Sequence, residues 1–115
     1  MSKNKKNKIK GTSSNDLIIG TDESDHIDAK GGDDIIFALG GDDHIKAGSG
    51  NDFIDGGSGD DDINAGKGDN VIYGGAGDDK IKSGSGDDFI DGGEGNDDID
   101  AGKGNDTVFG GAGDD

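Results

Sequence analysis

Aspartate is the residue with the greatest chemical capacity in this chain, and it recurs at a fixed spacing. From Asp16 to Asp115 every ninth residue is Asp, with Asn70 as the one exception. A carboxylate can act as a general acid or base, or its oxygens can bind a hard cation. A catalytic centre needs such groups at one place, whereas this chain repeats them along its length. The spacing therefore favours an array of cation sites.

The aspartates belong to a nine-residue unit that also fixes an apolar residue and glycines. Two residues after each of the first eleven stands a β-branched residue: Ile18, Ile27, Ile36, Ile45, Ile54, Ile63, Ile72, Ile81, Ile90, Ile99 and Val108. Four residues before the apolar one, every unit from Gly32 to Gly113 has Gly. The unit reads Gly-Gly-x-Gly-x-Asp-x-U-x, positions 1 to 9, with U a large aliphatic residue. Periodicity sustained over so many units is typical of a repeat architecture.

The unit predicts a turn followed by a short strand. Glycine adopts positive φ without steric cost, and the three residues x-U-x can form a strand whose middle side chain points inward. Two units make a coil of 18 residues with two opposed strands, so residues 18 apart stack in a parallel sheet. The sequence thus predicts an all-β, right-handed parallel β-roll, a β-helix or solenoid, with a thin core between two columns of aliphatic residues. One column starts at Ile18 and the other at Ile27.

Composition indicates that such a core needs help to fold. Only 26% of the 115 residues are hydrophobic, and the formal net charge is −16. These values are typical of disordered chains. Residues 11–115 carry six lysines against all 27 acidic residues, a charge of −21, which repels nucleic acid and anionic membranes but attracts cations. The chain has no Cys, so disulfides and thiolate zinc sites are excluded.

The nine-residue unit resembles the RTX, or hemolysin-type, calcium-binding repeat over residues 14–115. The resemblance implies a β-roll with calcium between successive turns, about eight ions in all. It also implies a secreted, extracellular protein exported from a Gram-negative bacterium by a type I system. The expected ligands are side chains of the Asp column and carbonyls of the Gly-rich turns. They are Asp25, Asp34, Asp43, Asp52, Asp61, Asn70, Asp79, Asp88, Asp97 and Asp106, with Gly32, Gly41, Gly50, Gly59, Gly68, Gly77, Gly86, Gly95 and Gly104.

Several segments depart from the unit. Residues 1–13 are basic and predict a disordered N-terminal tail, followed by the roll over residues 14–115. Its first two units lack the glycines and predict a capping turn with poor or absent sites. Lys30 and Leu39 replace the position 2 Gly, and Asn70 is expected to weaken the sites it shares with Asp52 and Asp88. The sequence ends at Asp115, halfway through a unit, which predicts truncation of a longer array.

Outward-facing residues predict two unlike faces. The sheet that contains Leu17, Ile35, Phe53 and Phe89 is expected to be apolar, and either a contact surface for another copy or neighbouring domain, or strand-forming residues only. The opposite sheet is expected to be charged. It carries His26 and His44 in register with Asp62, a weaker hypothesis for a transition-metal site against simple solvation.

The predicted function is a calcium-binding module that folds on binding extracellular calcium and supports export and stability of a secreted bacterial protein. The alternatives are a calcium-dependent adhesive module that binds polysaccharide or protein, and the non-catalytic tail of a secreted hydrolase or epimerase. No catalytic triad, phosphate loop or EF-hand glutamate can be placed in the chain, which predicts that it is not an enzyme. No apolar run has the length of a secretory signal or a membrane span.

Overall fold

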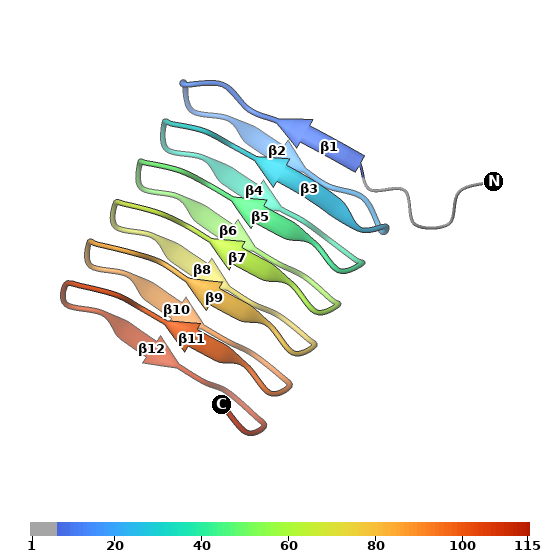
Figure 1. Ribbon diagram of the computed structural model, residues 1–115, viewed down its shortest axis with the longest axis vertical. Helices are drawn as coiled ribbons and strands as arrows, with labels where there is room; N and C mark the ends of the chain where they lie inside the picture. The colour runs from blue at the N-terminus through green and yellow to red at the C-terminus, as the bar shows by residue number, and fades with distance from the viewer. Residues whose placement is uncertain (1–6) are drawn as a thin grey trace.

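The computed structural model describes residues 7–115 and consists of short strands joined by turns (Figure 1). The strands are β1 (Asn7–Lys10), β2 (Leu17–Ile19), β3 (Asp25–Asp28), β4 (Ile35–Phe37), β5 (His44–Lys46), β6 (Phe53–Asp55), β7 (Asp62–Asn64), β8 (Val71–Tyr73), β9 (Lys80–Lys82), β10 (Phe89–Asp91), β11 (Asp98–Asp100) and β12 (Thr107–Phe109). Most are three residues long, as the unit predicts, because a turn separates each strand from the next, and these turns are Gly-rich from residue 31 onward.

The strands form two parallel sheets that face each other. The odd sheet has the order β1-β3-β5-β7-β9-β11, and the even sheet has the order β12-β10-β8-β6-β4-β2. Every pairing joins residues 18 apart, for example Ile36 with Ile54 and Ile45 with Ile63. The molecule is a slab of 46 × 35 × 15 Å, with turns along both long edges (Figure 1). The predicted β-roll of 18-residue coils is confirmed.

The roll begins earlier than the sequence predicted. Strand β1 pairs with β3 over four residues, with Asn7 opposite Asp25 and Ile9 opposite Ile27. Residues 7–10 are therefore part of the odd sheet, and their prediction as a disordered tail is wrong. Ile9 lies nine residues before Ile18, so one more backward step along the period finds this strand. Residues 1–6 of the predicted tail lie outside the described residues.

The core consists of the two predicted aliphatic columns. Ile27, Ile36, Ile45, Ile54, Ile63, Ile72 and Ile90 are fully buried between the sheets. Val108 belongs to the last coil, where no further strand covers it, and is 44% exposed. Four alanines at position 1, which sequence reasoning left out of the core, are also buried: Ala29, Ala38, Ala47 and Ala65. The apolar volume is small because one side chain per strand points inward.

Close stacking of the coils explains the glycines at positions 2 and 4. Gly59 has φ +103°, and a Cβ there would overlap the carbonyl oxygen of Gly41, one coil earlier. A Cβ on Gly57 would likewise overlap the carbonyl of Leu39. Lys30 and Leu39 occupy position 2 with φ of 70° and 71°, so their backbone takes the left-handed conformation of the glycines they replace. The presence of Lys or Leu instead of Gly at these two positions therefore leaves the turn shape intact.

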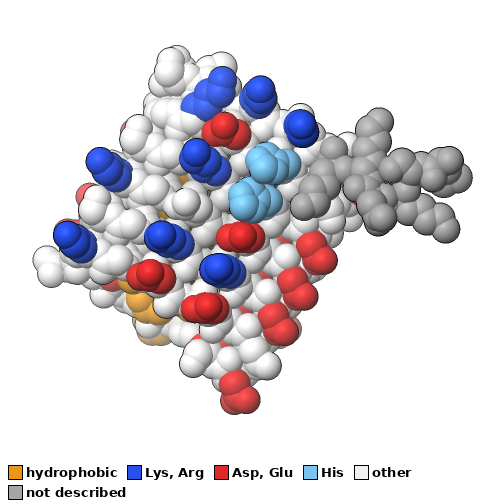
Figure 2. All heavy atoms as spheres, in the orientation of Figure 1, with side chains coloured by type: hydrophobic (Ala, Val, Ile, Leu, Met, Phe, Trp, Pro, Cys, Tyr) orange, Lys and Arg blue, Asp and Glu red, His pale blue; other side chains and the backbone are white. Residues whose placement is uncertain are grey.

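The outer faces of the two sheets differ in chemistry. On the even sheet, Phe37, Phe53, Tyr73, Phe89 and Phe109 form a continuous aromatic ladder with ring centroids 5.7–6.0 Å apart. The ladder alternates between positions 9 and 7, because the outward residues repeat every 36 residues rather than every 18. On the odd sheet, Lys, Asp and His side chains are intermixed (Figure 2). The predicted contrast between an apolar and a charged face is present.

Candidate metal centre

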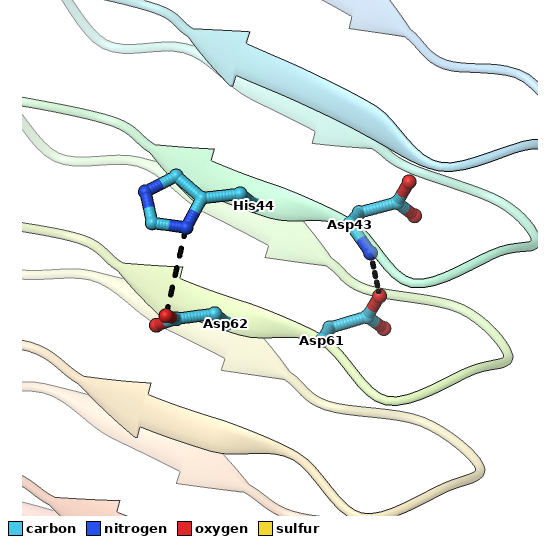
Figure 3. A network of polar contacts seen from close by, with 4 residues as sticks. All are labelled: Asp43, His44, Asp61 and Asp62. Carbon is cyan, nitrogen blue, oxygen red and sulfur yellow. Dashed lines mark hydrogen bonds and ion pairs between the residues drawn. The ribbon is translucent and has the colours of Figure 1, made fainter. Parts of the chain in front are cut away.

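The motif aspartates form a ladder along each edge of the roll. We call the turns that precede the odd strands the odd edge, and those that precede the even strands the even edge. In each turn one carboxylate oxygen, Oδ1, accepts a hydrogen bond from the backbone N–H of the motif residue one coil earlier. The bond from Asp43 N–H to Asp61 Oδ1 is 2.9 Å long (Figure 3). The same bond, at 2.7–2.9 Å, joins every successive motif residue from Asp16 to Asp106 on the even edge and from Asp25 to Asp115 on the odd edge.

The second carboxylate oxygen is buried without a partner in most of these turns. The bare Oδ2 atoms are those of Asp34, Asp43, Asp52, Asp61, Asp79 and Asp97. The six side chains are 1–5% exposed. A buried, unpaired carboxylate oxygen costs free energy unless a positive charge or a donor meets it. The repeated bare oxygen is therefore the feature of this fold that a bound cation would stabilise.

Asn70 indicates which groups surround that oxygen. Its Oδ1 accepts from Asp52 N–H as the aspartates do, so its Nδ2 takes the place of Oδ2. Nδ2 lies 3.2 Å from the Gly68 carbonyl oxygen and 3.4 Å from the Gly66 carbonyl oxygen. In an Asp turn, the bare Oδ2 takes the place of this Nδ2, so it faces the carbonyls of positions 2 and 4 without a donor. Calcium binds six to eight such hard oxygen ligands, so these residues fit the ion.

Burial raises the pKa of several of these carboxyl groups. Desolvation, assisted by the neighbouring carboxylates on the same edge, raises the pKa of Asp61 to about 8 and that of Asp43 and Asp79 to about 7. The pKa of Asp52 rises to about 6, again mainly because burial removes water from the carboxylate. A backbone hydrogen bond from the preceding coil lowers each pKa, but it does not offset the loss of water. Without a cation, these turns favour protonated carboxyl groups.

A second ladder lies beside the first and was missed by sequence reasoning. The position 5 side chains are Asp, Asn or Ser, and those from Asn15 to Asn96 each accept from the backbone N–H of position 5 one coil later. The bond from Asp60 N–H to Asp42 Oδ1 is 2.8 Å long. Nine equivalent bonds run along both edges. In the motif ladder the accepting side chain belongs to the later coil, whereas in this second ladder it belongs to the earlier coil. Each pair of adjacent coils is therefore joined by side chains from both coils. The signal was a polar residue before every motif Asp.

The first turns contain an internal replacement for a cation. Thr21 donates from its backbone N–H to Asp25 Oδ2 at 2.7 Å and from its hydroxyl to Asp25 Oδ1 at 2.8 Å. Thr12 makes the same pair of contacts with Asp16. Both threonines occupy position 2, where later units have Gly. Asp25 is thus stacked on Asp43, as predicted, but both its carboxylate oxygens already have donors.

The histidines of the odd sheet do not form a centre of this kind. The rings of His26 and His44 stack with centroids 4.9 Å apart, and His44 Nδ1 lies 3.5 Å from Asp62 Oδ2. Within residues 7–115, no group of three or more His, Cys, Asp or Glu side chains is arranged to hold a metal ion. The transition-metal hypothesis gains no support. The edge turns differ because they place backbone carbonyls beside the motif side chain.

Comparison with known families agrees with this geometry. The model of the RTX calcium-binding nonapeptide repeat matches residues 10–45, 28–63, 37–72, 55–90, 65–99 and 83–115. Curated proteins and solved structures give no significant match. Among the described residues, no helix has the length and hydrophobicity needed to cross a membrane. The overlapping matches cover nearly the whole chain, which therefore belongs to the RTX family of calcium-binding repeats.

Proposed function

We propose that this chain is a calcium-triggered folding module, with calcium held in the turns by the motif aspartates and by carbonyls of the position 2 and position 4 residues. The observation that carries the proposal is the set of six buried Oδ2 atoms without a partner. The sequence-based expectation of about eight ions counts all stacked pairs of motif residues. The bare oxygens support about six. When bound, calcium supplies the positive charge that these oxygens lack.

A secreted setting fits this chemistry. RTX repeats are typical of extracellular proteins, and calcium is abundant outside cells but scarce in the cytosol. A chain that stays unfolded before export and folds afterwards would support export and stabilise an attached domain. We propose export from a Gram-negative bacterium by a type I system as the setting. A β-roll of RTX repeats is a non-catalytic type of module, and its role here is structural.

Calorimetric titration of the metal-stripped chain tests calcium binding directly. We expect about six equivalents of calcium to bind, because six turns present a bare carboxylate oxygen. Magnesium should bind weakly, since it prefers near-ideal octahedral geometry and retains its water ligands. The proposal would be contradicted if calcium addition gave no binding heat, or if calcium and magnesium bound equally well.

Protons should compete with calcium for the same oxygens. The raised folded pKa values of Asp43, Asp61 and Asp79 exceed the ordinary value of 3.8, so the metal-free roll holds protons that the unfolded chain releases. Its stability is then greatest below about pH 4 and falls as the pH rises through 7 to 8. Protons and calcium each stabilise the folded turns, so loss of the protons leaves more of the stabilisation to calcium, and the calcium midpoint of folding should increase between pH 6 and pH 8.5.

Circular dichroism of metal-stripped protein between pH 6 and pH 8.5 measures both effects: the metal-free sample gives the stability of the roll, and calcium titration at each pH gives the folding midpoint. The Asp61→Asn variant is the matched control, because it removes the carboxyl group whose pKa is raised to about 8 and should flatten the pH dependence near that value. A metal-free roll that becomes more stable with increasing pH would contradict the assignment of these protons.

A second role, as a contact surface, is favoured by the even sheet. Leu17, Ile19 and Ile35 are 46–66% exposed there, and they continue the aromatic ladder towards the N-terminal coils. We propose that this face meets a second copy or a neighbouring domain. Replacing both Phe53 and Phe89 by Ser should then reduce self-association without changing calcium uptake. Sedimentation in calcium measures this, and a monomeric parent would contradict a homotypic contact.

An adhesive role towards polysaccharide would instead appear as calcium-dependent retention on a polysaccharide matrix.

A further inference from the structure

Two successive turns in the middle of the even edge differ from the Asp34 and Asp52 turns before them in the second terminal atom of the motif side chain, which is hydrogen-bonded rather than bare. In the turn of Asn70, the side-chain amide donates to the carbonyl oxygens of Gly68 and Gly66. Asn70 is 1% exposed, and its Oδ1 and backbone N–H are both hydrogen-bonded to adjacent coils. Every polar atom of this side chain therefore has a partner. The opposite orientation of the amide would set NH₂ against the Asp52 N–H, so the hydrogen bonds permit only this one.

The next turn on the same edge is closed by a hydroxyl. Ser83, at position 1, is fully buried, and its Oγ lies 2.8 Å from Asp88 Oδ2 and 2.7 Å from the Ala101 carbonyl oxygen. It has one hydrogen to donate, and the carboxylate of Asp88 is the stronger acceptor of the two. The earlier even-edge turns have Ala29 and Ala47 at position 1, which offer no donor, and there Asp34 and Asp52 retain a bare Oδ2. The odd edge shows no such interruption from Asp43 to Asp97.

We propose that Asn70 and Ser83 form a metal-free clasp in the even edge, and that calcium does not enter the two turns they close. The amide of Asn70 points a donor at the carbonyls that an ion would bind, and a cation there would face the partial positive charge of the NH₂ group. Ser83 places a donor on the second oxygen of Asp88. The odd edge then binds calcium continuously from Asp43 to Asp97, whereas the even edge binds it in the turns of Asp34 and Asp52. This inference rests on the proposed calcium-binding function.

Counting bound calcium by native mass spectrometry at saturating calcium tests the clasp. Asn70→Asp replaces the amide by a bare oxygen, and should raise the count by one ion relative to the parent. Ser83→Ala reproduces the even-edge turns of Ala29 and Ala47, and should also raise the count by one. Asn51→Asp is the matched control. It adds the same charge on the same edge, but at position 5, where Asn51 Oδ1 accepts from Asp69 N–H and a carboxylate can do the same, so the count should not change.

The outcomes separate this inference from the function it rests on. If the parent binds calcium but neither Asn70→Asp nor Ser83→Ala gains an ion, the two turns are not closed by these donors and the clasp is refuted. If Asn70→Asp does not fold even in saturating calcium, the Ser83→Ala count decides. A parent that binds no calcium refutes the proposed function itself. A gain in Asn70→Asp and Asn51→Asp but not in Ser83→Ala would show that added charge rather than loss of the donor recruits the ion, and would overturn the clasp.

Discussion

Removal of calcium is expected to convert the roll into an expanded coil. The folded slab has a radius of gyration of 13.0 Å, whereas an unfolded chain of this length has about 34 Å. The physical reason is that the core holds one aliphatic side chain per strand, while both edges stack carboxylates at every coil. Without a cation, each buried bare oxygen costs about 1–3 kcal/mol, and the carboxylates repel one another.

Calcium reverses this balance because it binds the folded turns and not the coil. At a tenfold excess over the dissociation constant, one site contributes about 1.4 kcal/mol, so six contribute about 8 kcal/mol. That is comparable to the whole stability of a small domain, about 5–15 kcal/mol. Folding should therefore follow calcium cooperatively.

Small-angle scattering and far-ultraviolet circular dichroism, recorded in chelator and then in millimolar calcium, measure this transition. Magnesium at the same ionic strength is the control, because it screens the charge equally but fits the turns poorly. A compact, β-rich chain in excess chelator at pH 8.5, where most of these carboxyl groups are ionised, would refute the coupling. Collapse by magnesium to the same degree would indicate screening rather than site binding.

The nine-residue period was sufficient to predict the fold. Because the apolar residue and the motif Asp each recur in one register, an 18-residue coil is the arrangement that buries the first and brings the second to the edges. Ile9 and Asn7 fit the same register, but they were assigned to the tail because of the lysines around them. Charge near a terminus was thus given more weight than periodicity, and the structure shows that periodicity is the stronger signal here.

The partner of each polar atom was harder to predict. The sequence places Asp43 and Asp61 on one edge, but which oxygen accepts the backbone N–H depends on the rotamer and on the distance between coils. For the same reason, Asn70 was interpreted as a weaker ligand, whereas its amide orientation makes it a donor to two carbonyls. Thr21 and Ser83 were not identified as donors at all. These hydrogen-bond roles depend on how side chains stack between coils, so the sequence of a single unit does not predict them.

The glycines of positions 2 and 4 can be tested separately from the ligands. Gly59→Ala keeps the backbone carbonyl of this turn, but adds a Cβ that would overlap the carbonyl oxygen of Gly41 at a φ of +103°. Strain at such a φ costs about 1–3 kcal/mol, and overpacking costs about 1–3 kcal/mol more. We expect a loss of about 2–6 kcal/mol, a large fraction of the stability of a small domain. Because folding and binding are linked, the variant should need more calcium to fold.

The calcium midpoint from circular dichroism, with urea unfolding at saturating calcium, measures this loss. Gly31→Ala is the matched control. Position 3 accepts Ala76 and Ala112 in other units, and the nearest atoms to a new Cβ on Gly31 are Ser49 Oγ at 3.7 Å and the Ser13 carbonyl oxygen at 3.9 Å. This variant should fold at the parent's calcium concentration. If Gly59→Ala also does so, the coils can separate enough to admit a methyl group, and stacking contact between turns would not be the reason for glycine at position 4. If only Gly59→Ala shifts, the calcium array depends on coil spacing as well as on its ligands, because the Oδ1 bonds that align successive turns require that spacing.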